Sequence, residues 1–227
     1  IHVVGLATIG GYVWAAMLGA AAAAVVVYLV AGTGRGGATP VKLALAGAAV
    51  TAGLLSLTNA VLITSQQTFD SFRFWQVGAL AGRDWSVVLP VLPFLLAGAV
   101  LTLGTARVLN GLALGDDVAR GLGQKVGLGR AVTALGVVVL CGAATALAGP
   151  IAFVGLVVPH AVRALVGVDY RWILPLSALV APTLLLVADV VGRVVLPPGE
   201  VPAGVMAAVV GAPVFFWLVR RSRGVEL

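Results

Sequence analysis

Charge is what this sequence most lacks. Only 10% of its 227 residues are charged and 61% are hydrophobic, whereas ordinary soluble domains carry about 25% charged residues. The single Cys141 excludes a disulfide framework and a thiol metal cluster. No Gly-Lys-Ser/Thr phosphate-loop signature occurs, so the sequence offers no such site for ATP. The composition therefore predicts a polytopic membrane protein.

Seven apolar stretches are present, and most reach the roughly 20 residues that about 30 Å of hydrocarbon requires. They cover residues 3–31, 41–63, 87–105, 131–148, 151–165, 173–196 and 201–219. We predict an all-α fold, a bundle of seven transmembrane helices that forms one membrane domain over residues 1–227. The fifth stretch is short, and Pro150 before it and Pro159 within it indicate a half-helix or a tilted helix.

The basic residues orient the chain. The net charge of +6 does not indicate nucleic-acid binding, because the Lys and Arg residues lie in short connections between apolar stretches and no polar domain carries a basic stripe. Of the 14 basic residues, eleven lie in one alternate set of connections and three in the other. The first set is cytoplasmic by the positive-inside rule, which also places the C-terminus inside.

Seven crossings with an inner C-terminus place the first residue outside. Because the chain begins with Ile1 close to a helix start, we expect an odd number of helices to be missing before it. The alternative is a seven-span protein with an outer N-terminus.

Two connections have a structure of their own. Residues 64–85 form the longest outer connection, where aromatic residues suit the membrane interface, and we expect a short surface helix there. The inner loop 107–130 carries apolar residues at helical spacing, and Asp116 and Asp117 suit the first turn of a helix. We predict a helix-turn-helix projection that either binds a partner or folds back on its own helices.

Residues 149–163 (GPIAFVGLVVPHAVR) are the most distinctive stretch of the chain. We expect the prolines to fix the ends of a short returning helix whose His160 and Arg163 face the cytoplasm. A metal site at His160 is not expected, because a site needs several ligands and the second imidazole, His2, lies at the far end of the chain.

Seven stretches resemble the permease subunits of the FecCD family of bacterial ABC importers, which take up ferric siderophores, haem and cobalamin. They are residues 75–85 (WQVGALAGRDW), 112–123 (LALGDDVARGLG), 148–163 (AGPIAFVGLVVPHAVR), 174–177 (LPLS), 188–193 (ADVVGR), 200–204 (EVPAG) and 211–215 (GAPVF). The stretches follow the family's order and span nearly the whole chain from Trp75 onward.

The resemblance implies a ten-helix permease that forms a dimer around a translocation path, with the seven helices here as the fourth to the tenth. It also implies that the inner loop is the coupling segment that docks on the ATP-hydrolysing subunits. The coupling residues would be Leu112, Leu114, Gly115, Asp116, Asp117, Ala119, Arg120, Leu122 and Gly123. Gly149, Pro150, Phe153, Gly155, Pro159, His160, Arg163 and Asp189 would be structural motif residues. His160 would cap its short helix or lie near the ATPase interface.

Two outer residues are candidates for docking a substrate-binding protein. Arg193 matches a family position at which Arg pairs with a Glu of that protein. The alternative is an internal ion pair with Asp189, four residues earlier on the same helix face. Glu200 is expected to be exposed on the outer side, where it serves docking or a turn.

The predicted function is that of a permease subunit that moves a ferric siderophore or a similar metal chelate across the bacterial inner membrane. The expected partners are two ATP-binding subunits, a second permease copy or a homologue, an extracytoplasmic binding protein and the lipid bilayer. ATP and Mg²⁺ would bind to the partner subunits, and this chain would bind no cofactor. The alternatives are a proton-coupled transporter, a membrane enzyme, or an ABC permease for free metal ions or cobalamin.

Overall fold

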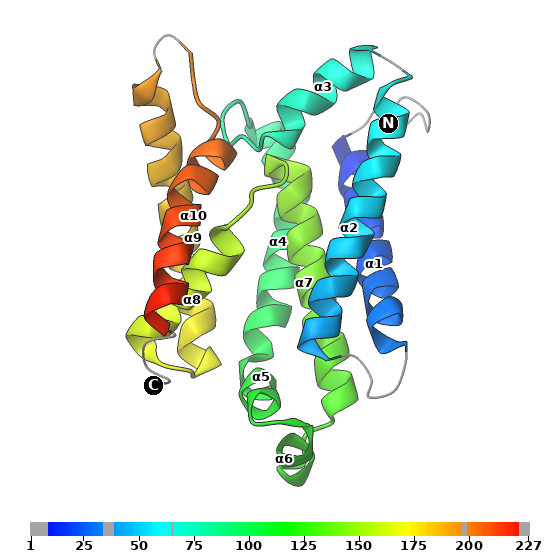
Figure 1. The fold of residues 1–227 in the computed structure, drawn as a ribbon, viewed down its shortest axis with the longest axis vertical. Helices are drawn as coiled ribbons and strands as arrows, with labels where there is room; N and C mark the ends of the chain where they lie inside the picture. Colours follow the sequence, from blue (N-terminus) through cyan, green and yellow to red (C-terminus); the bar gives the residue numbers. More distant parts are fainter. Residues whose placement is uncertain (1–8, 34–38, 65, 197–198, 223–227) are drawn as a thin grey trace.

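The described part of the chain, residues 9–33, 39–64, 66–196 and 199–222 of a computed structural model, is built from α-helices and contains no strand (Figure 1). The helices are α1 (Ile9–Gly32), α2 (Pro40–Leu62), α3 (Gln66–Gln76), α4 (Trp85–Gly104), α5 (Ala106–Ala113), α6 (Asp116–Gly121), α7 (Val126–Ala148), α8 (Val154–Val166), α9 (Tyr170–Val195) and α10 (Ala203–Ser222). The all-α fold predicted from the sequence is therefore confirmed.

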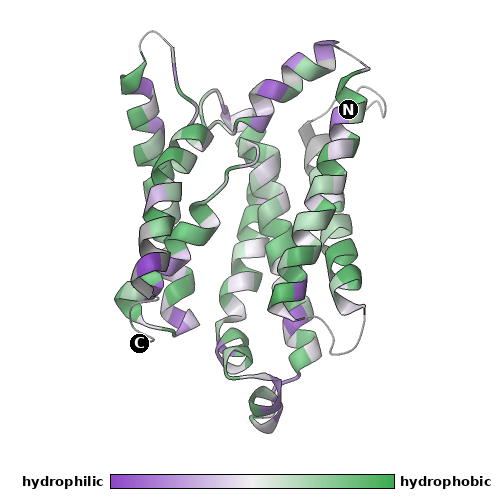
Figure 2. Cartoon of the chain, in the orientation of Figure 1, coloured by the Kyte–Doolittle hydropathy of each residue, from purple (hydrophilic) through white to green (hydrophobic). Residues whose placement is uncertain are grey.

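Five helices are long and apolar enough to cross a membrane, and two shorter apolar helices accompany them. The five spans are Trp14–Gly32, Val41–Leu62, Trp85–Gly104, Val126–Ala148 and Tyr170–Val195, and the shorter helices are Val154–Val166 and Ala203–Phe216. Each predicted apolar stretch thus contains one helix. Apolar residues cover these helices along most of their length, while hydrophilic residues gather toward the ends (Figure 2), as a lipid environment requires.

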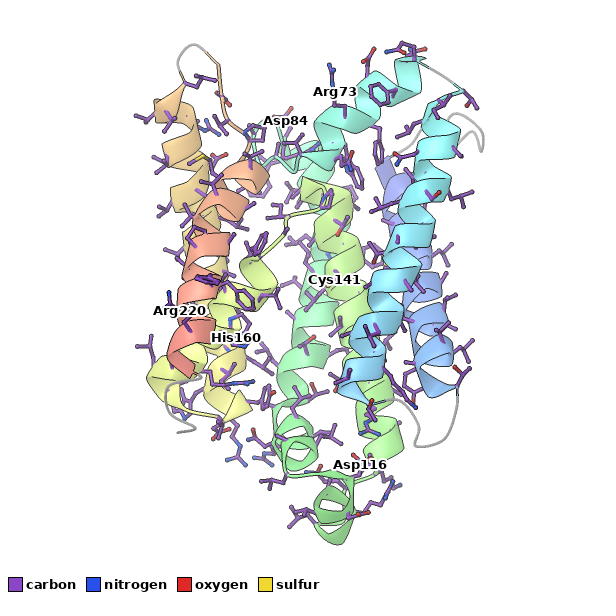
Figure 3. The ribbon with its side chains drawn as sticks, viewed as in Figure 1. Arg73, Asp84, Asp116, Cys141, His160 and Arg220 are labelled. Atoms are coloured by element: carbon purple, nitrogen blue, oxygen red, sulfur yellow. The ribbon has the colours of Figure 1, made fainter. Side chains whose placement is uncertain are left out.

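The seven apolar helices alternate in direction (Figure 1). The short helix α3 lies across one end of the bundle, and α5 and α6 project from the opposite end. Arg73 and Asp84 mark the first end and Asp116 marks the second (Figure 3). The predicted surface helix after residue 64 and the predicted helical projection within residues 107–130 are therefore both present, on opposite sides of the membrane domain.

The helices pack in two groups. Helices α1, α4 and α7 contact one another and α2 packs on α1, while α8, α9 and α10 form the second group. The groups are joined where α9 meets α4 and α5. Val91 and Ala143 form the buried centre of the first group, and Val158, Val162 and Ile173 form that of the second. Small residues allow close helix approach: a Cβ on Gly98 would lie 2.8 Å from the Cγ atom of Leu140.

Backbone segments from three connections meet at the end of the bundle where α3 lies, which is the predicted outer end. The amide of Ala79 donates to the carbonyl of Ala148 at 2.9 Å, and the amide of Gly204 donates to the carbonyl of Gly78 at 3.0 Å. Gly149 has φ +77° and its α-carbon faces the carbonyl of Trp75 so closely that a side chain would collide with it. Glycine is required there because it alone has no Cβ and adopts positive φ without cost.

Candidate functional site

Helices α5 and α6, with the C-cap Leu122, form a short helical hairpin that we call the inner knob, residues 106–122. Gly115, with φ +103°, makes the turn between the two helices. Ala119 is fully buried beneath the hairpin. The side chain of Gln124 closes the base of the knob, because its Nε2 donates to the carbonyl of Arg107 at 3.2 Å and Gly111 leaves room for its amide group.

Ion pairs hold α6 in place. Asp116 and Asp117 occupy the first turn of α6, as the sequence predicts, where carboxylates face the positive end of the helix dipole. Asp116 binds Arg130 of α7 at 2.7 Å, and Asp117 binds Arg120 at 3.1 Å. Because Arg130 lies on the adjacent membrane helix, the Asp116 pair fixes the orientation of the knob relative to α7.

The exposed face of the inner knob carries several apolar side chains. Leu114 is 65% exposed, Val118 49% and Leu122 64%, although water surrounds this end of the protein in the predicted topology. Leu112 is half-buried. The apolar residues at helical spacing therefore fall into two sets. Ala119 is buried, and Leu114, Val118 and Leu122 are exposed. A cluster of exposed apolar side chains outside the membrane is typical of a protein-binding surface.

The start of α8 is strained. Phe153 is the only described non-glycine residue with positive φ, at φ 67° and ψ −32°, and the amide of Val154 donates to the carbonyl of Ala152 at 2.9 Å. This is the geometry of a γ-turn, which is rare for residues that carry a side chain. Phe153 packs closely against Gly211 of α10, because a Cβ added to Gly211 would lie only 2.8 Å from the Cβ of Phe153. The strained turn thus lies at a tight contact between the start of α8 and α10.

The structure corrects two expectations for α8. Pro159 does not end the helix, because it lies inside α8; a membrane helix tolerates an internal proline more readily than a soluble one. His160 is not a cap either, because six helical residues follow it. Its Nδ1 lies 2.8 Å from the carbonyl oxygen of Leu156, and its ring meets that of Phe215 edge-on, with centroids 5.8 Å apart. His160 thus joins α8 to α10. Pro150 precedes the helix as expected, and Gly155 faces open space.

Four polar side chains meet where α8 turns into α9, and we call them the inner corner cluster: Asn110, Arg163, Asp169 and Tyr170. Nδ2 of Asn110 donates to Oδ1 of Asp169 at 2.6 Å, and Oδ1 of Asn110 accepts from the amide of Tyr170 at 2.8 Å. Arg163 donates to the hydroxyl of Tyr170 at 3.1 Å and lies 5.6 Å from the centre of its ring. Three helices, α5, α8 and α9, therefore share one polar contact.

Asp169 is the N-cap of α9. Its side chain accepts from the amide of Arg171 at 2.9 Å, which satisfies one of the free amides at the helix start. The hydrogen bond from Asn110 lowers the pKa of Asp169 below its ordinary value, and the amide and the charge of Arg171 act in the same direction. The carboxylate form is thus the one that this corner stabilises.

The sequence interpretation missed Asn110 and Asp169. They lie 59 residues apart, and no periodicity links side chains at that distance. The one available signal was Asp169 itself, because an Asp that directly precedes an apolar helix is a typical N-cap.

At the predicted outer end, Arg193 binds Asp189. Nε and NH2 of Arg193 lie 3.0 and 2.9 Å from Oδ2 of Asp189, whose side chain is 15% exposed. The internal ion pair predicted as one alternative is confirmed. The Arg193 side chain remains 49% exposed, and Glu200 is exposed nearby in sequence. In the described part of the chain, no group of three or more His, Cys, Asp and Glu residues could hold a metal ion; His2 lies outside that part.

Comparison with known proteins places the whole bundle among transport permeases. Residues 1–221 match the family model of the FecCD transport family. The chain is 45% identical over 208 residues to the ferric enterobactin transport system permease protein FepD of Escherichia coli, covering 91% of this chain and 62% of that protein. It is 44% identical over 219 residues to the iron(3+)-hydroxamate import system permease protein FhuB of Bacillus subtilis, covering 96% and 56%.

A solved structure shares the arrangement of helices. It was assigned to a metal-chelate type ABC transporter in an inward-facing conformation, and it matches with a TM-score of 0.79 at 29% identity, covering 94% of this chain and 68% of that one. The chain spans less than two thirds of the length of the curated relatives that it matches.

Proposed function

Because this chain belongs to the FecCD transport family, we propose that it is a permease subunit of an ABC importer that moves a ferric siderophore or a similar metal chelate into the cytoplasm. The observation that carries the proposal is the combination of an apolar multi-helix bundle with an exposed apolar knob at one end. The named relatives carry ferric enterobactin and iron(3+)-hydroxamate, which supports a ferric chelate as the substrate class.

The inner knob is the docking surface for the ATP-binding subunits in this proposal. Leu114, Val118 and Leu122 offer apolar area that water surrounds until a partner covers it. Asp116, bound to Arg130 on α7, keeps the knob fixed to the bundle. A movement of the ATP-binding subunits that displaces the knob is therefore transmitted to the membrane helices.

The opposite end receives the substrate. Arg193 is half-exposed at the outer end of α9, where its Nε and one terminal nitrogen bind Asp189. A glutamate on a substrate-binding protein could share Arg193 with Asp189, because the Arg193 side chain is 49% exposed, whereas the Asp189 side chain is 15% exposed and needs the arginine beside it. The docking contact would thus add to the internal pair.

The positive-inside rule supports the orientation. The knob and the end of α10 lie at the same end of the bundle (Figure 1), and the basic residues concentrate there. That end faces the cytoplasm of a bacterial inner membrane, and the C-terminus lies on the cytoplasmic side. The ATP-binding subunits supply ATP and Mg²⁺, and a second permease copy or homologue completes the translocation path.

Transport in this proposal needs no reaction at this chain. The helices switch between two packings that open toward opposite sides, and each partner favours one of them. The test is a pull-down of the ATP-binding subunits by the full permease in detergent. Wild-type permease retains them, and the Leu114→Asp variant loses them while remaining folded by circular dichroism. Equal retention by both proteins would refute the knob as the docking surface.

A further inference from the structure

We propose that Asn110 and Asp169 form a rigid link through which the inner knob moves α9. The inference rests on the proposed function, since it names the contact that transmits the movement of the knob. Asn110 lies on α5, within the knob, and Asp169 caps the first turn of α9. The two hydrogen bonds of Asn110, at 2.6 and 2.8 Å, both end on this cap.

Asn110 uses both ends of its amide on the same helix start. Its Nδ2 binds the carboxylate of Asp169, and its Oδ1 accepts from the amide of Tyr170. Asp169 itself accepts from the amide of Arg171. Two of the free amides at the start of α9 are thereby satisfied, one by its own cap and one by a side chain from α5. Two simultaneous bonds fix the direction as well as the distance between the helices.

Helices α5 and α9 contact each other at this corner, and among the described residues the hydrogen bonds between side chains of α5 and the start of α9 are those of Asn110. An open pocket of about 460 Å³ lies where α4 and α5 face α9, lined by Gly104, Arg107, Arg171 and Pro175 among others. The polar contact of Asn110 therefore adds a directional connection to a joint that is not filled with side chains on this side. Arg163 then brings in α8, through its hydrogen bond and its cation contact with Tyr170.

The far end of α9 carries Asp189 and Arg193. Helix α9 has 26 residues, so it reaches about 39 Å at 1.5 Å per residue. Pro175 and Pro182 lie inside the helix and each removes one backbone hydrogen bond, so α9 has two bending points between Asp169 and Arg193. A displacement of the knob that passes through Asn110 acts on the inner end of this helix, and in the proposed link it reaches the outer surface, where the substrate-binding protein docks in the proposed function.

The side chains permit a swap that separates the link from a general stabilising role. In Asn110→Asp, two carboxylates face each other and the 2.6 Å hydrogen bond loses its donor. In the double variant Asn110→Asp/Asp169→Asn, the new amide at 169 can donate to the new carboxylate at 110. That carboxylate can still accept from the amide of Tyr170. Oδ1 of Asp169 accepts both from Asn110 and from the amide of Arg171, so the new amide at 169 that donates to position 110 gives up the Arg171 bond in this geometry. The swap therefore restores the two bonds between residue 110 and α9, with the charge on the other helix.

The matched control is Asp84→Asn. Asp84 is also the N-cap of a membrane helix, α4, but its side chain makes no capping hydrogen bond, and it lies at the outer end (Figure 3). This variant makes the same chemical change as Asp169→Asn at a cap that is not linked to the knob.

The experiment uses the full permease assembled with its ATP-binding subunits, with Cys141→Ala as the background. Spin labels at Ala113→Cys on α5 and Trp172→Cys on α9 report the distance across the link. A separate variant carries Val194→Cys, because Val194 is exposed at the outer end of α9. The rate at which a membrane-impermeant maleimide labels this cysteine is measured without nucleotide and again after trapping with ATP and vanadate.

We expect one narrow spin-label distance that is unchanged by trapping, and a maleimide rate at position 194 that changes on trapping. Asn110→Asp should broaden the distance and abolish the change in rate, the swap should restore both, and Asp84→Asn should alter neither. A distance as narrow in Asn110→Asp as in the parent, or a swap as broad as the single variant, would overturn the link. If the parent complex binds no ATP, the proposed function fails, and the distance in the permease alone still decides the link.

Discussion

Replacing Leu114 and Leu122 of the inner knob by alanine tests the docking surface most quantitatively. Full burial of a leucine side chain contributes about 1.5–3 kcal/mol. Leu114 is 65% exposed and Leu122 is 64% exposed, so a partner that covers them gains about 1–2 kcal/mol from each. The double variant should weaken the permease–ATPase complex by about 2–4 kcal/mol, which is roughly 30-fold to 700-fold in Kd.

The assay is titration of the purified permease with its ATP-binding subunits in detergent, followed by fluorescence anisotropy. The matched control is Leu18→Ala, because Leu18 is 67% exposed but lies within the α1 membrane span. Its variant should bind as the wild type does. An unchanged Kd in the double variant, or an equal loss in the control, would refute the reasoning from exposed area.

Three further predictions concern the membrane helices and the inner corner. Gly149→Ala should destabilise the protein by at least about 1 kcal/mol, because position 149 has a positive φ and a Cβ there would collide with the carbonyl of Trp75. The control Gly53→Ala, whose Cβ meets open space, should leave the melting temperature unchanged or raise it slightly. Equal melting temperatures of the two variants would contradict this prediction. Arg193→Glu should weaken the affinity for the binding protein, and the loss should depend on salt concentration. Surface plasmon resonance measures this affinity, and an unchanged affinity would rule out a docking role for Arg193. Because the pKa of Asp169 is lowered on folding, its contribution to stability is complete above the unfolded pKa and is lost as the pH falls through the folded pKa. Melting curves at falling pH should therefore show an acid-side loss that Asp169→Asn lacks, and identical pH profiles would contradict it.

The sequence predicts much of the fold, because membrane helices follow from local composition. Each apolar stretch contains one helix, and Asp116 and Asp117 mark the start of α6. The start of α8 and the role given to its prolines were wrong for a physical reason. Proline usually ends a soluble helix, but Pro159 lies inside this one, and the strained turn at Phe153 delays the start of the helix to Val154.

The inner corner cluster could not be predicted in the same way. Asn110 and Asp169 belong to separate helices, and their contact depends on how α5 packs against α9. A hydropathy pattern shows which face of a helix is apolar, but it does not show which polar side chains meet in space. The ion pair of Asp189 with Arg193 was predictable, because both residues lie one turn apart on a single helix.

The central claim is that this chain carries a ferric chelate across the membrane at the expense of ATP hydrolysed by partner subunits. The most direct test reconstitutes the full permease, its ATP-binding subunits and its binding protein in liposomes. Uptake of radioiron-labelled ferric enterobactin, ferric hydroxamate and haem, and of radiocobalt-labelled cobalamin, is then measured with and without ATP. The account predicts ATP-dependent uptake of at least one ferric siderophore. Uptake that follows an imposed proton gradient and needs no ATP would contradict it.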